Sequence, residues 1–382
     1  MTESPHHADP VAPPWSWLSA CPPLWRTAAL AAATALLLRI IAVTVIGILA
    51  HEPWSAVMAG HDGGEYLSYA SALTRLDLNA VPEDARRHSP GWPMAISLAS
   101  LGLPPWLAAC ATMWICACGS LFLFGTILQR HSGLAAPECR RAIWGFALVY
   151  PAWLYYQCFA LGEAAFVFLL LAATLAYLSP HRLAGYALVG LAALVRPPGA
   201  LLALAFAAND LREGRRWHAL WPWTFALIPQ LVWGLATRAV WGATFLQVHR
   251  PHFGLPFSGF QEIHRVGTFR AIYVIACVAF FVITAALLLR EAARSRWANP
   301  LVNVAAFFSG AFLLFHLCLR DLFYHGNTIY TFNYQDRYLL GALPFAMMAM
   351  QRLWTWPVAA AGGAASLGLG IYWGINYFAA AG

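Results

Sequence analysis

The stretch LWRTAALAAATALLLRIIAVTVIGIL, Leu24–Leu49, is long and apolar enough to cross a lipid bilayer once. About 20 apolar residues suffice to cross a hydrocarbon core about 30 Å thick. The whole chain shares this character, because 60% of its 382 residues are hydrophobic and only 10% are charged. Its mean hydropathy is +0.60. These values lie outside the range of soluble globular proteins and predict an all-α, polytopic membrane protein with about ten or eleven transmembrane helices.

Apolar runs along the chain define the expected topology. We expect further spans at 105–129, 142–156, 159–178, 220–241, 269–289, 301–319, 338–350 and 356–378. Residues 183–208 carry Pro197 and Pro198 in mid-run, so we expect two short helices there, broken at the prolines. Residues 1–23 are polar and proline-rich and predict a disordered cytoplasmic tail. Residues 24–382 then form a single multispanning domain.

The distribution of arginine sets the expected orientation. All 23 basic residues are arginines, and most lie in short loops between expected spans. Loops of this kind, such as the one around Arg140 and Arg141, face the cytoplasm. The long loop 51–104 and most acidic residues then lie outside. We expect a multi-pass protein of a bacterial inner membrane with its active site facing the periplasm, and the net charge of +7 does not indicate a nucleic-acid partner.

The segment HDGGEYLSYASALTRL, His61–Leu76, places two carboxylates at the start of an amphipathic pattern. Asp62 and Glu65 have the three-residue separation of a helix capping box, in which Glu65 reaches back to the Asp62 backbone. Tyr66 and later apolar residues share one face, which predicts a helix lying at the membrane interface. A capping Asp at this surface can also accept a substrate proton, so the cap and the catalytic base are compatible roles for Asp62.

The segment RRHSPGWPMAISLAS, Arg86–Ser100, follows in the same loop. Arginines on the outer side run against the positive-inside rule, so Arg86 and Arg87 either bind an anion or anchor the loop to lipid headgroups. The apolar run 93–103 after them is too short to span and predicts an interfacial or re-entrant helix.

Charged residues at three later positions also need an explanation. Glu163 stands near the outer end of an expected span, and Arg196 lies on the proline-broken segment. Ionisable residues at such depths mark functional sites, or the two pair with each other. Arg337, between Asp336 and Tyr338, begins a late span. An arginine there suits the phosphate of a lipid whose tail lies in the bilayer, and snorkelling to the interface is the alternative.

These five stretches, in this order, resemble the GT-C glycosyltransferases, multispanning enzymes that use polyprenyl-phosphate sugars. The matching elements are Asp62 with Tyr66, SPGWPMAISL, Glu163, GLAALVRPPG and DRYLLGALPF, and together they extend from Asp62 to Phe345. The similarity is closest to protein mannosyltransferases and aminoarabinose transferases. Ser89 departs from the family's double proline, and Gly341 stands where a proline is frequent.

The resemblance implies that the chain is a hexosyl- or mannosyltransferase-like enzyme. In it Asp62 is the general base on the acceptor hydroxyl and Arg337 contacts the donor phosphate. The residues to which it gives a substrate-binding role are Arg337, Tyr338, Tyr66, Arg86, Arg87, Glu163, Arg196 and His61. The implied partners are a polyprenyl-phosphate sugar donor and a lipid, glycan or protein acceptor.

The chemistry of the residues points the same way. A lipid phosphate is a good leaving group that needs charge stabilisation more than a general acid. One carboxylate and several arginines therefore suffice for an inverting single displacement. The sequence shows no metal-ligand cluster, and arginines can replace a divalent cation. If such a cation takes part, His61, His249 and His252 are its candidate ligands.

Two other functions remain open at this point. A lipid-linked-glycan polymerase or ligase would use a large outer loop, for which Gly242–Thr268 with Arg250, His252, His264 and Arg265 is the candidate. A transporter or flippase would use Glu163 and Arg196 as a coupling pair near the membrane midplane. It would also show repeat symmetry, which the sequence does not.

Overall fold

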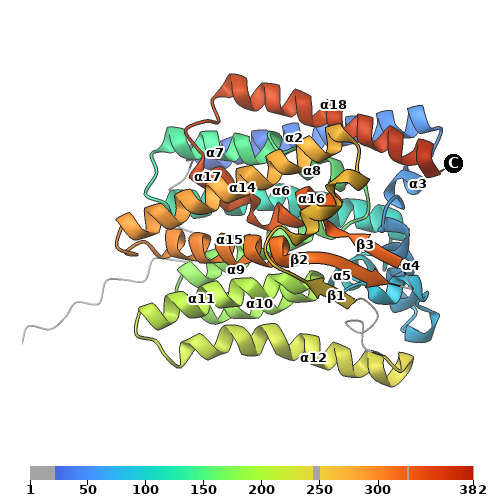
Figure 1. Cartoon of the computed structure of the whole chain (residues 1–382), viewed down its shortest axis with the longest axis horizontal. Coiled ribbons are helices and arrows are strands. Elements are labelled where there is room, and N and C mark those ends of the chain that lie inside the picture. Colours follow the sequence, from blue (N-terminus) through green and yellow to red (C-terminus); the bar gives the residue numbers. More distant parts are fainter. Residues whose placement is uncertain (1–21, 244–249, 325–326, 382) are drawn as a thin grey trace, which may run out of the picture.

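The computed structural model describes residues 22–243, 250–324 and 327–381 and is built almost entirely of helices (Figure 1). The first half contains α2 (Pro22–Ala50), α3 (Trp54–Met58), α4 (Gly63–Thr74), η1 (Leu78–Ala80), η2 (Asp84–Arg87), α5 (Gly91–Ala99), α6 (Pro105–His131), α7 (Ala136–Leu148), α8 (Pro151–Tyr155), η3 (Tyr156–Cys158), α9 (Glu163–Leu178) and α10 (Arg182–Val195). The second half contains η4 (Pro197–Gly199), α11 (Ala200–Arg212), η5 (His218–Leu220), α12 (Trp221–Trp241), η6 (Ser258–Arg265), α14 (Thr268–Arg294), α15 (Pro300–Cys318), η7 (Thr331–Tyr334), α16 (Gln335–Tyr338), η8 (Leu339–Ala342), α17 (Leu343–Ala349) and α18 (Trp356–Ala381). The all-α, polytopic class expected from the sequence is confirmed.

Fewer single helices than expected have the length and hydropathy of a complete membrane span. Within the described residues six helices are long and apolar enough to cross a membrane. They are Leu24–Ala50, Pro105–His131, His218–Trp241, Thr268–Arg294, Pro300–Cys318 and Trp356–Ala380. The shorter apolar helices α9 and α10 accompany them. Six long helices and two short apolar ones thus match part of the ten or eleven expected spans by length and hydropathy.

Prolines divide several segments that were expected to cross as one helix. The expected span 142–156 is two pieces, because α7 ends at Leu148 and Pro151 begins α8. The expected span 338–350 is likewise a series of short turns, η8 and α17, with Pro344 in the first turn of α17. A proline lacks a backbone N–H and clashes with the preceding turn, so it favours the start of a new helix. The expected break at Pro197 is confirmed, since Arg196 is extended and separates α10 from η4.

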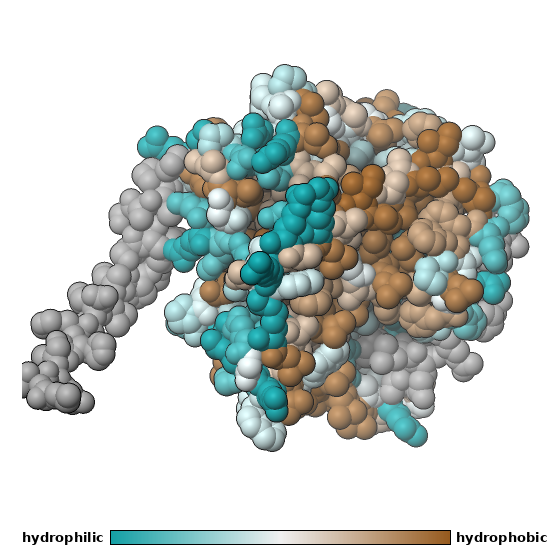
Figure 2. Space-filling view, turned by 60° about the vertical axis from the view of Figure 1, so that its left-hand side comes forward, coloured by the Kyte–Doolittle hydropathy of each residue, from teal (hydrophilic) through white to brown (hydrophobic). Residues whose placement is uncertain are grey.

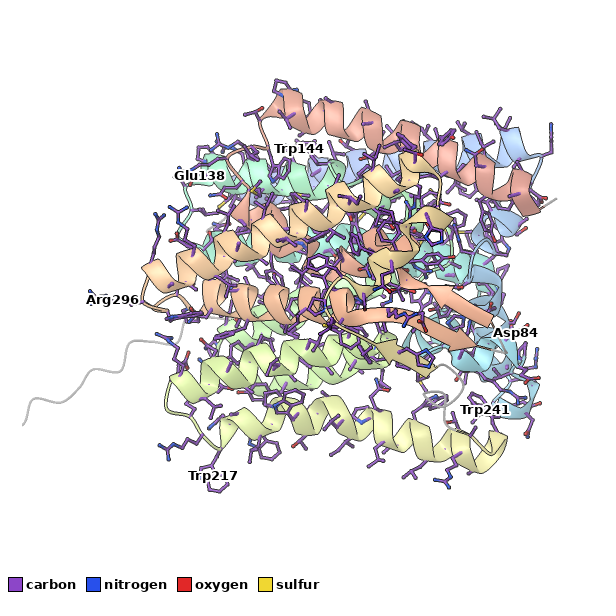
Figure 3. The ribbon with its side chains drawn as sticks, viewed as in Figure 1. Asp84, Glu138, Trp144, Trp217, Trp241 and Arg296 are labelled. Carbon is purple, nitrogen blue, oxygen red and sulfur yellow. The ribbon has the colours of Figure 1, made fainter. Side chains whose placement is uncertain are left out.

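The long helices run side by side between two ends of the molecule (Figure 1). The helix α12 packs on α10 and α11 along one edge, and α18 packs on α2 and α8 along the opposite edge. Glu138 and Arg296 lie at one end, and Asp84 and Trp241 lie at the other (Figure 3). We call the first the arginine-rich end, formed by residues 130–141, 209–218 and 290–299. The second, formed by residues 51–104, 250–267, 319–324 and 327–334, is the site end.

Figure 2 looks toward the arginine-rich end. Hydrophilic residues gather over it, and a broad hydrophobic flank lies beside them. Many side chains exposed on the long helices are large and apolar, for example Leu231 on α12 at 62% and Ile272 on α14 at 62%. A flank of this kind matches lipid rather than water.

A small sheet at the site end was not expected from the sequence. Its strands are β1 (Arg250–Phe253), β2 (Leu319–Tyr324) and β3 (Asn327–Tyr330), all antiparallel, in the order β1-β2-β3. β2 directly continues α15, and β1 pairs with it from a distant part of the chain, His252 opposite Asp321. The pairing brings the 250–267 segment over the end of α15.

Candidate active site

A cavity of about 300 Å³ opens at the site end. Its lining comes from the turn before α4, the η2–α5 connection, α9, η4, the end of α15, the sheet and α16. The residues that line it are His61, Asp62, Tyr66, Arg87, His88, Ser89, Phe166, Val195, Arg196, Pro197, Pro198, Pro251, Phe312, Phe315, His316, Leu319, Leu322, Tyr334, Arg337 and Tyr338. Four of the five sequence stretches singled out above contribute lining residues, and Glu163 of the fifth contacts two of these residues.

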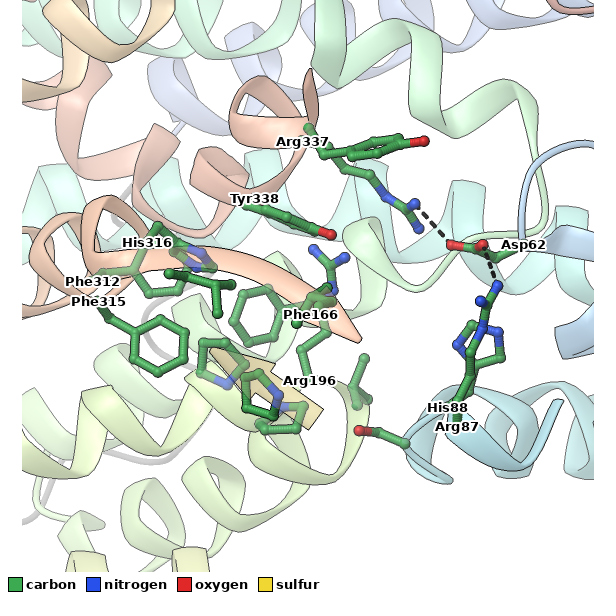
Figure 4. Close-up of a pocket in the computed structure, with 18 of the residues that line it drawn as sticks. Asp62, Arg87, His88, Phe166, Arg196, Phe312, Phe315, His316, Arg337 and Tyr338 are labelled. Atoms are coloured by element: carbon green, nitrogen blue, oxygen red, sulfur yellow. Dashed lines mark hydrogen bonds and ion pairs between the residues drawn. The ribbon is translucent and has the colours of Figure 1, made fainter. Parts of the chain in front are cut away.

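Asp62 occupies the N-cap position of α4, but its side chain does not cap the helix. It accepts instead from Arg337 Nη1 at 2.8 Å and from Arg87 Nη2 at 3.2 Å (Figure 4). Glu65 does not reach back either, because it bonds Arg87 and His88, so the expected capping box is wrong. Two guanidinium groups attract the carboxylates more strongly than the backbone N–H groups of a short helix.

The charges around Asp62 determine its protonation. Burial acts to raise the pKa of the Asp62 carboxyl, but the neighbouring Arg337, His88 and Arg87 outweigh it and hold that pKa well below its usual range. The side chain keeps a relative exposure of 28%, so it stays in contact with solvent. Asp62 is therefore ionised, accessible and, while paired with arginine, only weakly basic.

Arg337 connects two acids that are far apart in the sequence. Besides Asp62 it donates through Nε to Glu163 Oε1, which is also 3.1 Å from Arg196 Nη2. Glu163 is 1% exposed and begins α9 at the site end, not at mid-span. The pairing of Glu163 with Arg196, one of the two alternatives drawn from the sequence, is confirmed. Three acids (Asp62, Glu65 and Glu163) and three arginines (Arg87, Arg196 and Arg337) thus form one continuous network.

A second ion pair fixes the backbone that carries Arg337. Asp336 is fully buried and binds Arg270 of α14 through both oxygens, at 2.7 and 3.0 Å. Tyr150 of the α7–α8 connection donates to the Asp336 carbonyl at 3.0 Å. The short helix α16 is therefore held from two sides, and the Arg337 side chain points into the cavity.

Aromatic side chains complete the polar part of the cavity. Tyr66 packs against His88 with ring centroids 4.2 Å apart. The Arg196 guanidinium lies over the Tyr338 ring, with its central carbon 5.9 Å from the ring centroid. His61 bonds Tyr155 through Nε2 at 2.8 Å and stacks on Tyr377. Burial, with Arg337 assisting, lowers the pKa of His61 to about 4.

Of the substrate-binding residues expected from the sequence, all of which the structure describes, two do not line the cavity. Glu163 contacts two of the lining residues, whereas Arg86 lies away from the cavity. Its Nε donates to the Val81 carbonyl at 3.1 Å, and its guanidinium lies 5.4 Å from the Trp241 ring centroid. These contacts join the first loop to α12. Of the two neighbouring arginines, Arg87 is the one that lines the cavity.

One group of side chains in the described residues has atoms close enough to hold a metal ion. Ligand atoms of Asp62, Glu65 and His88 lie within 4.8 Å of one another. Arg87 bonds both carboxylates from between them, so a cation would have to displace this guanidinium. The donor set fits a divalent ion only in part, and the arginine already balances the charge.

The loop Gly242–Thr268, the candidate for a polymerase or ligase site, is described in part. Residue His249 and the side chains of Arg250 and Arg265 lie outside the described residues. His252 bonds Asp321 at 2.6 Å, and His264 bonds the Gln261 carbonyl at 3.1 Å. Pro251 is the residue of this loop that lines the cavity, among those described.

Sequence reasoning missed His316, which lines the cavity from the end of α15, and Arg270, which holds Asp336. Neither residue belongs to the five stretches singled out above, and each lies on an apolar span. His316 in an apolar run was a signal of the kind that flagged Arg196.

Comparison with known proteins gives a match by structure alone. No family model and no curated protein sequence matches the chain. The chain resembles ArnT from Cupriavidus metallidurans in the apo state with a TM-score of 0.52 and 15% sequence identity, over 83% of this chain and 59% of that one. The same protein bound to undecaprenyl phosphate gives a TM-score of 0.48 and 16% identity, over 81% and 59%.

The resemblance shows the fold. The chain spans about 59% of the length of ArnT and shares its fold over that part.

Proposed function

We propose that the chain is a GT-C-type glycosyltransferase that transfers a sugar from a polyprenyl-phosphate donor to an acceptor hydroxyl. The observation that carries this proposal is the contact between Asp62 and Arg337 in a cavity that continues into an aromatic, apolar arm. A donor of this class has a phosphate between a sugar and a hydrocarbon chain. A site for such a donor needs cations at the phosphate, a base on the side of the sugar and apolar surface on the side of the hydrocarbon chain.

The three arginines suit the phosphate. A guanidinium presents paired N–H donors that match the oxygens of a phosphate, and it stays charged at every physiological pH. Arg337 and Arg196 both contact Glu163, so this acid holds the two guanidinium groups close together at the cavity. As the donor bond breaks, negative charge grows on the phosphate and its contacts with the arginines strengthen.

The transfer step is a single displacement. The acceptor oxygen forms a bond to the anomeric carbon, and the bond from that carbon to the phosphate oxygen breaks. The electron pair leaves with the polyprenyl phosphate, and the acceptor proton moves to Asp62. The partly exposed Asp62 carboxyl then releases the proton to solvent.

Donor binding would also activate the base. In the resting site Arg337 and Arg87 lower the basicity of Asp62. A phosphate that draws Arg337 away removes the largest of these attractions and raises the pKa of Asp62 toward the range of a working base. The base is therefore strongest when the donor is in place.

The proposal also includes the location of the site in the cell and the class of acceptor. The site faces the periplasm from a bacterial inner membrane, and the acceptor is a lipid, glycan or protein. A hexose of the mannosyl type is the first sugar to test, because the sequence stretches are similar to those of protein mannosyltransferases. Proposed catalysis relies on arginines and requires no divalent cation.

The experiment is sugar transfer from radiolabelled polyprenyl-phosphate sugars in proteoliposomes, with wild type, Asp62→Asn and Asp77→Asn. Asp77 caps η1 in the same loop and is exposed, and Asn preserves a cap. We expect Asp62→Asn to lose transfer by about 10²–10⁴-fold, whereas Asp77→Asn keeps it. Equal transfer by wild type and Asp62→Asn would remove Asp62 as the base. No transfer by wild type from any donor would overturn the proposed function.

A further inference from the structure

The cavity has two chemically different ends (Figure 4). Asp62, Arg87 and His88 lie at one end, and Phe312, Phe315 and His316 lie at the other, with Arg196 between them. The second end, which we call the aromatic arm, is lined by Phe166, Phe312, Phe315, His316, Leu319 and Leu322. Apart from His316, every one of these side chains is apolar.

His316 is the exception in the aromatic arm. It is 3% exposed, and neither Nδ1 nor Nε2 has a hydrogen-bond partner. Its ring is stacked on Tyr338, with centroids 5.5 Å apart and an interplanar angle of 17°. Phe312 and Phe315 meet it edge-on at 4.6 and 5.1 Å.

The backbone around His316 is fixed. Gln335 Nε2 donates to the His316 carbonyl at 3.0 Å, at the point where α15 gives way to β2. The imidazole is therefore presented to the cavity from a rigid helix end. An imidazole in its neutral form offers one N–H and one acceptor nitrogen.

Two unmet polar atoms in such surroundings are unfavourable unless a ligand satisfies them. A hydrocarbon chain cannot do so. A polar group of a ligand can supply a partner for an imidazole nitrogen, and the position of His316 in the cavity indicates which group this is.

Along the cavity the order is Asp62, then Arg196, then His316 (Figure 4). Tyr338 joins the last two, because Arg196 lies over its ring and His316 stacks on that ring. With the acceptor at Asp62 and the phosphate at the arginines, the sugar lies toward Asp62 and the prenyl chain toward Phe312 and Phe315. His316 then stands where the phosphate meets the prenyl chain.

We propose that His316 is a further donor-binding residue, which donates an imidazole N–H to the phosphate from the side of the prenyl chain. This inference rests on the proposed function and adds a phosphate contact that carries no charge. It gives the aromatic arm a direction, with the prenyl chain leaving past Phe312 and Phe315.

The test compares the binding of undecaprenyl phosphate and of undecaprenol to the purified full chain in detergent. Wild type, His316→Phe and His316→Asn are measured, along with their melting temperatures. His316→Phe keeps an aromatic ring in the stack and removes both nitrogens, so it tests the hydrogen bond alone. His316→Asn restores a side-chain N–H.

We expect His316→Phe to weaken binding of undecaprenyl phosphate about tenfold or more, because a hydrogen bond to a charged group is lost. Binding of undecaprenol should not change, and His316→Asn should recover part of the loss. The melting temperature of His316→Phe should be equal to or above that of wild type, since the unmet nitrogens are gone. Inorganic phosphate, added as a competitor, should displace the lipid only weakly.

Three outcomes would overturn the inference. One is undecaprenyl phosphate binding to His316→Phe as tightly as to wild type. Another is unchanged binding of undecaprenyl phosphate together with loss of binding for an undecaprenyl-phosphate sugar, measured as a third ligand, which assigns His316 to the sugar. The third is a lower melting temperature with parallel loss for both lipids, which makes His316 structural. Failure of wild type to bind undecaprenyl phosphate would instead contradict the proposed function itself.

Discussion

Two buried charge networks lie at opposite ends of the molecule, and they differ in what surrounds them. At the arginine-rich end, Asp210 is 0% exposed and accepts from Arg182 at 2.7 Å, Tyr177 at 3.0 Å and Tyr186 at 2.6 Å. Asn209 and Glu213 extend this network through Tyr177 and Arg182. At the site end, Asp62, Glu163 and Arg337 form a comparable network, but it lines a cavity.

Asp210 and its partners are packed among α9, α10 and α11, and both of its oxygens are satisfied. At the site end Glu163 Oε2 and both nitrogens of His316 have no partner. Asn303, which bonds Asn209, also has an unmet oxygen, so the difference between the networks lies in the cavity. Packed charges that satisfy one another hold helices together, whereas charges that line an open volume suit a ligand. The contrast assigns structure to the first network and binding to the second.

The largest effect is expected from Arg337→Gln. This change removes the cation that Asp62 and Glu163 share and, in the proposed mechanism, the main phosphate contact. We expect transfer to fall by about 10³-fold. Transfer assays on reconstituted protein check this, with Arg75→Gln as the matched control, because Arg75 is an exposed arginine at the same end. Comparable activity of Arg337→Gln and Arg75→Gln would contradict the assignment of binding to the site-end network.

Asp210→Asn should act on stability instead. Removing this charge leaves Arg182 without one of its buried partners, which costs about 3 kcal/mol when a buried pair is broken. Thermal unfolding should show the loss, while transfer per folded molecule stays unchanged. A loss of transfer with unaltered unfolding would mean that the two networks have been assigned the wrong way round.

A smaller effect follows from pH. Since the pKa of His61 is lowered to about 4, folded His61 stays neutral while the unfolded residue binds a proton below its ordinary value of 6.5. Its contribution to stability is therefore complete above pH 6.5 and is lost as the pH falls toward 4. The melting temperature of His61→Gln should fall less over this interval than that of wild type. Parallel curves would show that His61 does not titrate as described.

The smallest effect is expected from metal removal. Arg87 lies between Asp62 and Glu65, where a cation would bind. Transfer measured with EDTA should equal transfer measured with added Mg²⁺ or Mn²⁺. Activity that disappears with EDTA and returns with Mn²⁺ would assign Asp62, Glu65 and His88 to a metal site.

The sequence allowed much of the site end to be predicted and little of the arginine-rich network. Glu163, Arg196 and Arg337 stood out because charged residues in apolar surroundings are rare. Asp62 stood out by its spacing from Glu65 and by the family resemblance, and the structure brings the four together. Pairing partners were harder to predict. The bond from Arg270 to Asp336 joins α14 to α16 across 66 residues, and no local pattern encodes it.

The errors have local causes. The capping box had the correct spacing, but long-range contacts with Arg337 and Arg87 compete for Asp62 and Glu65. The sheet was not predicted from the sequence because β1 and β2 are short and β2 continues an apolar helix. Span counting by hydropathy also joined segments such as 142–156 that prolines divide.

The central claim is that the site-end network binds a lipid phosphate and the arginine-rich network does not. Its most direct test is the binding affinity of undecaprenyl phosphate for wild type, Arg337→Gln and Asp210→Asn, each measured below its melting temperature. We predict that Arg337→Gln binds at least about tenfold more weakly, whereas Asp210→Asn binds as wild type does. Equal affinity of all three proteins, or a loss confined to Asp210→Asn, would contradict the account.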